Sequence, residues 1–115
     1  MDKNHKGHFV ILTEPISVNA LYTGRRFLTS KGRDTKYKIA REVLIQLKGH
    51  EIIKDKFALE ISFFLKDNKK DIDGLLKGLL DSLNKILWED DRQIVELRVF
   101  KKVDKERPRT ELRIL

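Results

Sequence analysis

The clearest pattern in the chain is an alternation of apolar and polar positions over residues 56 to 66. The apolar members are Phe57, Leu59, Ile61, Phe63 and Leu65. A period of two is typical of a strand with one buried face. A shorter apolar run, His8 to Thr13, stops at Glu14-Pro15 and predicts an earlier strand, followed by a loop that extends to about Ser30.

Two other segments carry apolar residues at spacings of three and four, which predicts amphipathic helices. In the first, which begins near Ser30, these residues are Tyr37, Ala40, Val43, Leu44 and Leu47. Thr29 or Ser30 is available as its N-cap, and Gly49 marks its end. The second helix is expected from about residue 73 to 88, with Ile72, Leu75, Leu76, Leu79, Leu80, Leu83 and Leu87 on its apolar side.

Two further strands are predicted near the end of the chain, where Val95, Leu97 and Val99 alternate and Leu112 and Ile114 follow. We expect these strands to pair through a turn near Lys105 to Pro108. The order of elements is then β, α, β, α, β, β, and the first β-α-β step is a candidate crossover. A mixed sheet with two helices packed on one face buries every apolar face in two layers, so we expect an α+β sandwich. The length of 115 residues predicts a single domain, 1–115.

Composition limits the possible chemistry. The chain contains no cysteine, which excludes thiolate chemistry and is typical of a cytoplasmic protein. The first apolar run is too short for a signal peptide or a membrane span, so we expect no membrane partner. The histidines lack metal-ligand spacing, and no glycine-rich phosphate loop is present, so we expect no organic cofactor and a metal bound mainly by oxygen atoms. Trp88, near a helix end, is more typical of core packing than of base stacking.

The net charge of +7 is distributed unevenly. Residues 23 to 41 contain seven basic residues and one acidic residue, and residues 98 to 113 contain seven basic and three acidic residues. Between them, residues 71 to 96 contain seven acidic and three basic residues. A basic surface attracts phosphate, whereas carboxylates within it repel phosphate unless cations neutralise them. Each run alone is more often a solvated face, but the alternation favours a metal-dependent site that acts on nucleic acid.

Asp71 and Asp73 form a candidate metal-binding pair between the strand 56 to 66 and the second helix. Residues two apart point to the same side in extended backbone but are about 200° apart on a helix, so the pair can converge only where the helix begins. The positive end of the helix dipole favours negative charge there. The alternative is that either aspartate simply caps the helix.

A second acidic group, Glu89-Asp90-Asp91, follows the helix, and by itself it is equally typical of an acidic turn. Mg²⁺ prefers several oxygen ligands in octahedral geometry, and Asp71, Asp73 and Asp91 could supply them. They meet only if the strand after Asp91 lies beside the strand before Asp71. Lys77, one turn beyond Asp73, is placed either to contact the same phosphate or to form an i,i+4 ion pair with a neighbouring aspartate.

Five stretches of the chain carry a combined motif that is more specific than any of its pieces. They are Pro15-Ile-Ser17-Val-Asn19-Ala-Leu-Tyr22, Thr29-Ser-Lys-Gly32, Lys70-Asp-Ile-Asp-Gly-Leu-Leu-Lys77, Leu79-Leu-Asp81-Ser-Leu83 and Trp88-Glu-Asp-Asp91. Together they resemble the RusA family of Holliday-junction resolvases, from about residue 9 to the end. Two features depart from the family pattern. Gly74 stands where Asn is common, and the segment between Asp81 and Trp88 is one residue shorter.

The resemblance implies a homodimer that nicks opposing strands of a four-way DNA junction in recombination and repair, with Mg²⁺, or Mn²⁺ in its place. It assigns the metal-binding aspartates to Asp71, Asp73 and Asp91 and the catalytic lysine to Lys77. By position, we expect DNA contacts from Arg25, Arg26, Lys69 and Lys70.

Two alternatives remain open. The chain could be a non-catalytic basic module that binds branched DNA or structured RNA, or a related nuclease that cuts flaps or nonspecific duplex. A pure phosphate binder gains nothing from acids concentrated within its basic surface, which favours a nuclease over the binding module. The residues alone do not separate the two kinds of nuclease.

Overall fold

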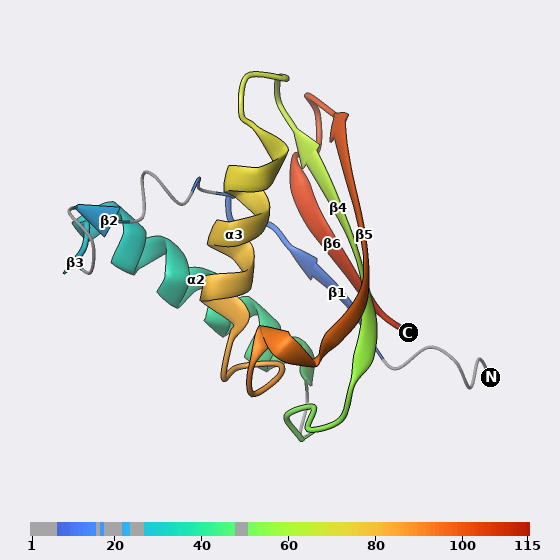
Figure 1. Ribbon diagram of the computed structural model, residues 1–115. Helices are drawn as coiled ribbons and strands as arrows, with labels where there is room; N and C mark the ends of the chain where they lie inside the picture. The colour runs from blue at the N-terminus through green and yellow to red at the C-terminus, as the bar shows by residue number, and fades with distance from the viewer. Residues whose placement is uncertain (1–6, 16, 18–21, 24–26, 48–50) are drawn as a thin grey trace.

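A computed structural model describes residues 7–15, 17, 22–23, 27–47 and 51–115 of the chain (Figure 1). The strands of the main sheet are β1 (Gly7–Ile11), β4 (Phe57–Leu65), β5 (Ile94–Val103) and β6 (Arg109–Ile114). The helices are α2 (Ser30–Leu47) and α3 (Ile72–Leu83), and a 3₁₀ turn, η1 (Asp91–Gln93), precedes β5. Two short strands, β2 (Tyr22–Thr23) and β3 (Phe27–Leu28), pair as a hairpin within the predicted loop. In the described part of the chain, no helix is long and apolar enough to cross a membrane.

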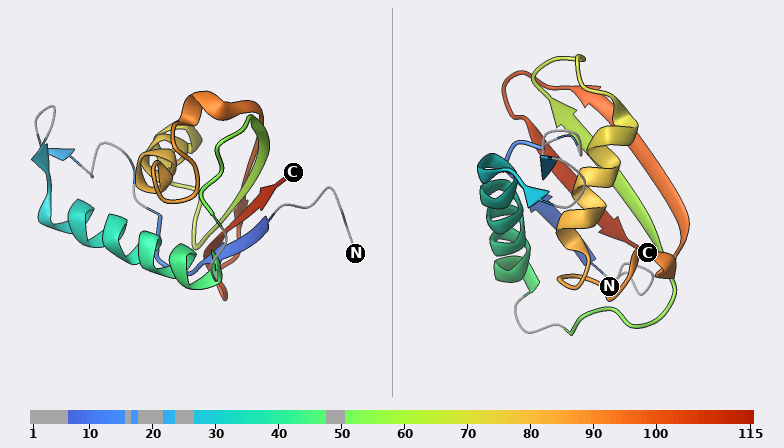
Figure 2. Two further views of the ribbon diagram at one scale, coloured as in Figure 1. Left: turned by 90° about the horizontal axis from the view of Figure 1, so that it is seen from below. Right: turned by 60° about the vertical axis from the view of Figure 1, so that its left-hand side comes forward.

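The main sheet is mixed, and its strand order is β1-β6-β4-β5. β6 lies antiparallel between β1 and β4, whereas β5 runs parallel to β4 at the edge of the sheet. Both α2 and α3 lie on the same face of this sheet (Figures 1 and 2). The predicted α+β architecture and the order of its main elements are therefore confirmed.

The expected pairing of the last two strands is wrong, because β4 lies between β5 and β6. The chain does turn at residues 105–108, but this turn carries it over the end of β4. There the amide of Asp104 donates to the carbonyl of Leu65 at 2.7 Å. The crossover through α3 leaves β5 parallel beside β4, and β6 then pairs with the other edge of β4, which would otherwise be unpaired.

The core lies between the sheet and the two helices. All five alternating residues of β4 are buried, as their period of two predicts. Around them pack apolar side chains from the neighbouring strands and from α3, which include Phe9, Ile11, Leu112, Ile114, Leu75, Leu79 and Leu83. This packing sets the position of α3, whose start carries the predicted aspartate pair.

α2 buries only part of the face that we expect from the sequence, in which Val43 and Leu47 are buried as predicted. Its buried residues are Gly32, Thr35, Ile39, Val43 and Leu47. Tyr37 and Leu44, which are expected in the core, are 67% and 53% exposed. Two apolar stripes run along this helix at nearly the same spacing, so packing against the sheet decides between them. The predicted start is confirmed, since Thr29 Oγ1 accepts from the amide of Gly32 at 2.8 Å, whereas Gly49 lies outside the described residues.

α3 ends at Leu83, before the predicted end near residue 88. Lys85 has φ 69°, and its amide donates to the carbonyl of Trp88 at 2.6 Å. An α-helix has neither a positive φ nor a hydrogen bond in this direction, so the helix cannot continue through Lys85. Trp88 is fully buried, its ring centroid lies 5.2 Å from that of Phe57, and its indole N–H donates to Asn84 Oδ1 at 2.6 Å. Trp88 is a core residue as predicted. Its packing is compatible with a tight turn after Leu83 and not with a helix that continues to residue 88.

Candidate active site and nucleic-acid interface

Asp71 and Asp73 lie where β4 connects to α3. Asp71 precedes the first helical turn in an extended conformation, with φ −75° and ψ 141°, and its carboxylate makes no capping hydrogen bond. The Asp73 carboxylate accepts from the amide of Gly74 at 2.9 Å, and both aspartates are exposed. The alternative that Asp71 caps the helix through its side chain is therefore not realised. Two accessible carboxylates remain at the positive end of the helix dipole.

Two lysine ammonium groups hold the backbone next to this pair. Lys70 Nζ donates to the carbonyl of Pro15 at 2.8 Å and lies 3.9 Å from a carboxylate oxygen of Glu14. Lys101 Nζ, from β5, donates to the carbonyl of Lys70 at 2.8 Å. These contacts fix the residue before Asp71 against the segment after β1 and against the edge strand. Lys70 is one of the expected DNA contacts, but its ammonium group is already engaged within the chain.

Gly74 lies against the segment that follows β1. A Cβ atom at this position would lie 2.8 Å from Ser17 Oγ, which is closer than van der Waals contact. Glycine therefore permits this approach, and a larger side chain would displace Ser17. The departure from the family pattern at Gly74 thus occurs where two stretches of the motif touch.

Asp91 begins η1 in a turn that is tightly hydrogen-bonded. The Gln93 side chain accepts from the amides of Glu89 and Asp90, both at 2.8 Å, and donates to the carbonyl of Ile53 at 2.9 Å. Asp90 caps the turn by accepting from the amide of Arg92 at 2.9 Å, and this bond lowers the pKa of Asp90.

The carboxyl group of Asp91 is in a less favourable setting. Partial burial raises the pKa of Asp91, and the neighbouring carboxyl groups of Asp90 and Asp81 raise it further. The negative end of α3 also lies on this side of the molecule, because Asp81 belongs to the last turns of the helix. Asp91 is therefore a carboxylate that a cation would stabilise.

Within one chain, Asp91 does not reach the pair formed by Asp71 and Asp73. β5 does lie beside β4, which is the condition that the sequence sets for these residues to meet. Because the two strands are parallel, however, β5 begins beside Phe57 at the start of β4, whereas Asp71 follows the end of β4. Asp71 and Asp73 lie at the start of α3, whose twelve residues are about 18 Å long, and Asp91 lies on the side of its far end (Figure 1). Among the described residues, no group of three or more acidic or histidine side chains is arranged to hold a metal ion.

Lys77 is exposed on α3, one turn beyond Asp73. Within the described residues, its ammonium group makes no ion pair with Asp73 or Asp81, so the alternative of an i,i+4 ion pair is not realised. Its expected role at the scissile phosphate stays a prediction. His8 Nε2 lies 3.7 Å from a carboxylate oxygen of Glu111 on the sheet.

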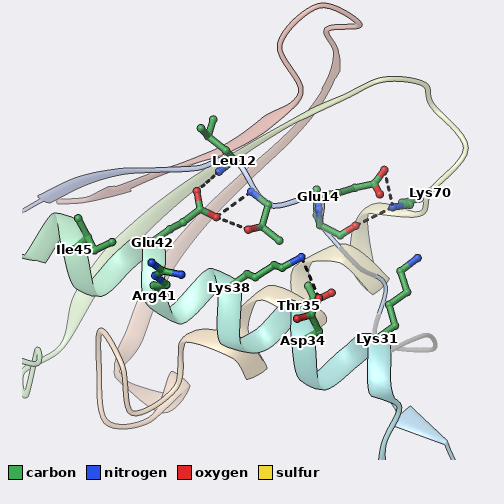
Figure 3. Close-up of a pocket in the computed structure, with 12 residues that line it drawn as sticks. Leu12, Glu14, Lys31, Asp34, Thr35, Lys38, Arg41, Glu42, Ile45 and Lys70 are labelled. Atoms are coloured by element: carbon green, nitrogen blue, oxygen red, sulfur yellow. Dashed lines mark hydrogen bonds and ion pairs between the residues drawn. The ribbon is translucent and has the colours of Figure 1, made fainter.

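A cleft of about 630 Å³ lies between α2 and residues 12–15, close to the start of α3 (Figure 3). Its basic lining residues are Lys31, Lys38, Arg41 and Lys70. A second cleft of about 290 Å³ shares Lys31 and Lys70 with the first and is also lined by Lys66 and Lys69. The expected contact Lys69 is thus exposed in a basic cleft, whereas Arg25 and Arg26 lie outside the described residues.

Lys31 and Arg41 belong to the first basic run, residues 23 to 41, and the sequence does not distinguish them from its other basic residues. The available signal is their spacing. Ten residues leave the two side chains about 80° apart around the helix axis, so both can line the same cleft.

Comparison with known proteins gives three findings. The family model described as Endodeoxyribonuclease RusA matches residues 17–115. A crossover junction endodeoxyribonuclease, RusA, of Enterobacteria phage HK97 is 31% identical over 98 residues, which cover 81% of each chain. An uncharacterized protein of Bacillus subtilis (strain 168), YqaN, is 38% identical over 61 residues, which cover 53% of this chain and 42% of that protein. The motif, the aspartate pair at the start of α3 and the extent of the family match lead to one conclusion: this chain belongs to the RusA family of endodeoxyribonucleases.

Proposed function

We propose that this protein is a magnesium-dependent endonuclease that resolves four-way DNA junctions by paired nicks, in cytoplasmic recombination and repair. One observation carries the proposal. In a member of the RusA family, Asp71 and Asp73 present exposed carboxylates at the start of α3, next to clefts lined by lysines. The phage HK97 relative, which is named as a crossover junction endodeoxyribonuclease, supports the choice of substrate.

The two carboxylates have the chemistry that a hard cation requires. Mg²⁺ is commonly held by one or two carboxylates together with water and substrate phosphate, and Mn²⁺ accepts the same oxygen ligands. When bound, the metal would activate water and stabilise the charge that develops on the phosphate. Lys77, exposed and without an ion pair among the described residues, would hold a phosphate oxygen beside the pair.

The distant position of Asp91 supports a site completed by a second chain. β5 is an edge strand, and among the described residues no strand pairs with its outer side. Val95, Leu97 and Val103 on β5 are 63%, 39% and 51% exposed. We propose that two β5 strands pair antiparallel around a two-fold axis. The start of one β5 then lies beside the end of the other, which brings Asp91 toward the partner's Asp71 and the partner's Asp73. One isologous contact creates two such sites, as paired nicking requires.

Nicking assays test the activity. Purified protein is incubated with a four-way junction, a linear duplex and a flap, each with Mg²⁺ or with EDTA. We expect symmetric nicks with 5′-phosphate ends in the junction only, dependent on Mg²⁺ and lost in Asp71→Asn. Cleavage that survives Asp71→Asn would overturn the site. Binding of the junction without nicking in Mg²⁺ or Mn²⁺ would instead support the non-catalytic module.

Sedimentation tests the dimer. Val95→Lys places a charge in the proposed interface and should shift the protein toward monomer, with loss of nicking. Leu44→Lys, at a similarly exposed apolar position on α2, is the matched control and should leave the dimer intact. An unchanged dimer in Val95→Lys would exclude β5 as the interface.

A further inference from the structure

The cleft between α2 and residues 12–15 contains acidic side chains that are already engaged. The Glu42 carboxylate accepts from the amides of Leu12 and Thr13, at 2.7 and 3.0 Å, and from the Thr13 hydroxyl group. Asp34 pairs with Lys38 at 3.1 Å (Figure 3). Lys38 thus neutralises Asp34, whereas Glu42 keeps its charge, because its donors are neutral, and holds residues 12 and 13 against α2.

The remaining acid of the cleft, Glu14, is also paired. Its carboxylate lies 3.5 Å from Lys66 Nζ and 3.9 Å from Lys70 Nζ. By contrast, Lys31 and Arg41 make no side-chain hydrogen bond or ion pair within the described part of the chain. The lining of the cleft has four basic and three acidic residues, a net charge of +1. Its two cations without a partner among the described residues, Lys31 and Arg41, are separated by about 15 Å along the axis of α2.

This spacing identifies the class of ligand. One small anion cannot contact both cations at once, whereas a nucleic-acid strand carries a phosphate about every 3.4 Å along a duplex axis. The second cleft, which shares Lys31 and Lys70, extends the same surface along Lys66 and Lys69. Lys70 directly precedes Asp71, so the cleft leads to the proposed site of cleavage.

We infer that this cleft binds the sugar-phosphate backbone of one duplex arm, with Lys31 and Arg41 contacting phosphates. This inference rests on the proposed function, because it assigns a path to the DNA that Asp71 and Asp73 would cut. Lys31 and Arg41 act in binding and orientation of the arm and touch no reacting atom. The contacts are to phosphate, so they should serve a linear duplex and a junction alike.

The test compares two charge-matched double variants of α2. Lys31→Gln with Arg41→Gln removes two positive charges from the cleft. Arg33→Gln with Lys36→Gln removes two from the same helix at positions that do not line it. Affinity for a labelled junction and a labelled duplex is measured by fluorescence anisotropy in EDTA over a series of salt concentrations, and thermal unfolding confirms that both variants fold.

We expect the cleft variant to bind about tenfold more weakly or worse and to lower the slope of log K against log salt by about 1.8, or about 0.9 for each lost phosphate contact. The control should keep nearly the wild-type slope. Equal losses in both variants, or an unchanged slope in the cleft variant, would overturn the inference.

Nicking assays separate this inference from the proposed function. If wild type nicks the junction and the cleft variant behaves like the control, only the cleft assignment fails. If wild type binds DNA without nicking it while the cleft variant loses affinity selectively, the nuclease fails and the cleft stands. If wild type binds neither junction nor duplex, both are overturned.

Discussion

The two ends of α3 carry the same kind of side chain in opposite settings. At its start, Asp71 and Asp73 are exposed, and the positive end of the helix dipole stabilises their charge. Beyond its end, Asp91 lies in a turn fixed by Gln93, and partial burial, followed by the nearby carboxyl groups of Asp90 and Asp81, raises its pKa. Negative charge is therefore stabilised at the start of α3 and opposed beyond its end. We call the start of α3 the open end, because its two carboxylates are exposed. We call residues 84–93 the rigid end, because Trp88 is buried there and the Gln93 side chain holds the turn through hydrogen bonds.

The largest expected effect follows from removing a carboxylate at the open end. Asp71→Asn should reduce the nicking rate by roughly a thousandfold or more, because a metal contributes several kcal/mol to the transition state and each 1.36 kcal/mol is about tenfold. Junction affinity in EDTA should remain. Single-turnover nicking of a labelled junction measures the rate. Glu89→Gln, at the other end, is the control, and an equal loss in that variant would erase the distinction between the two ends.

The next effect is on stability at the rigid end. Trp88→Ala should lower the free energy of unfolding by about 3–5 kcal/mol, the usual cost of truncating a buried tryptophan. Urea titration measures it. Ile72→Ala, at the open end, removes a side chain that is 38% exposed and should cost much less. If Ile72→Ala cost as much as Trp88→Ala, the open end would be as rigidly packed as the other.

A mixture of two inactive variants tests whether the ends cooperate between chains. Asp71→Asn and Asp91→Asn homodimers should both be inactive, whereas subunit exchange should give about half heterodimers, each with one intact site. These should nick one strand without resolving the junction, which a native gel with a denaturing second dimension detects. No recovery, with heterodimers shown by mass spectrometry, would contradict a site shared between chains.

The smallest effect concerns the pKa of Asp91. Since this pKa is raised by folding, ionisation of Asp91 costs folding free energy above the raised pKa, and the cost disappears below the ordinary pKa of a carboxyl group. Asp91→Asn should therefore raise Tm slightly at neutral pH and leave it unchanged in strong acid. The gain should be a few tenths of a kcal/mol, because exposed charges are screened. A lower Tm at neutral pH would show that Asp91 stabilises its turn.

Much of the local structure follows from the sequence. The period of two in β4 predicts both the strand and its buried face, and the aspartate pair is placed correctly at the start of α3. The buried face of α2 follows only in part, because Tyr37 and Leu44 recur at nearly the same spacing as the buried residues but are exposed. Periodicity specifies a stripe, and only contact with the sheet selects which stripe is buried.

The candidate site likewise contains residues whose relative positions can be predicted from the sequence and residues whose positions cannot. Asp71 and Asp73 could be placed together from the sequence, because backbone geometry relates the side chains of residues two apart. Asp91 could not, since its position depends on the direction in which β5 runs beside β4. The sequence could not distinguish Lys31 and Arg41 from the other basic residues of α2. They lack a partner among the described residues because Glu42 and Asp34 contact other groups, and those contacts depend on tertiary structure.

The two helices, the four strands of the main sheet, their order along the chain, the aspartate pair and the family motif can be predicted from the sequence, since each depends on residues that are near one another in the chain. Tertiary structure alone decided that β6 lies between β1 and β4 and that β5 is parallel to β4. Strand order and direction arise from contacts between distant segments, which no local period encodes. That parallel direction places Asp91 at the opposite end of α3 from Asp71 and Asp73, and it is the physical reason for proposing a site built from two chains.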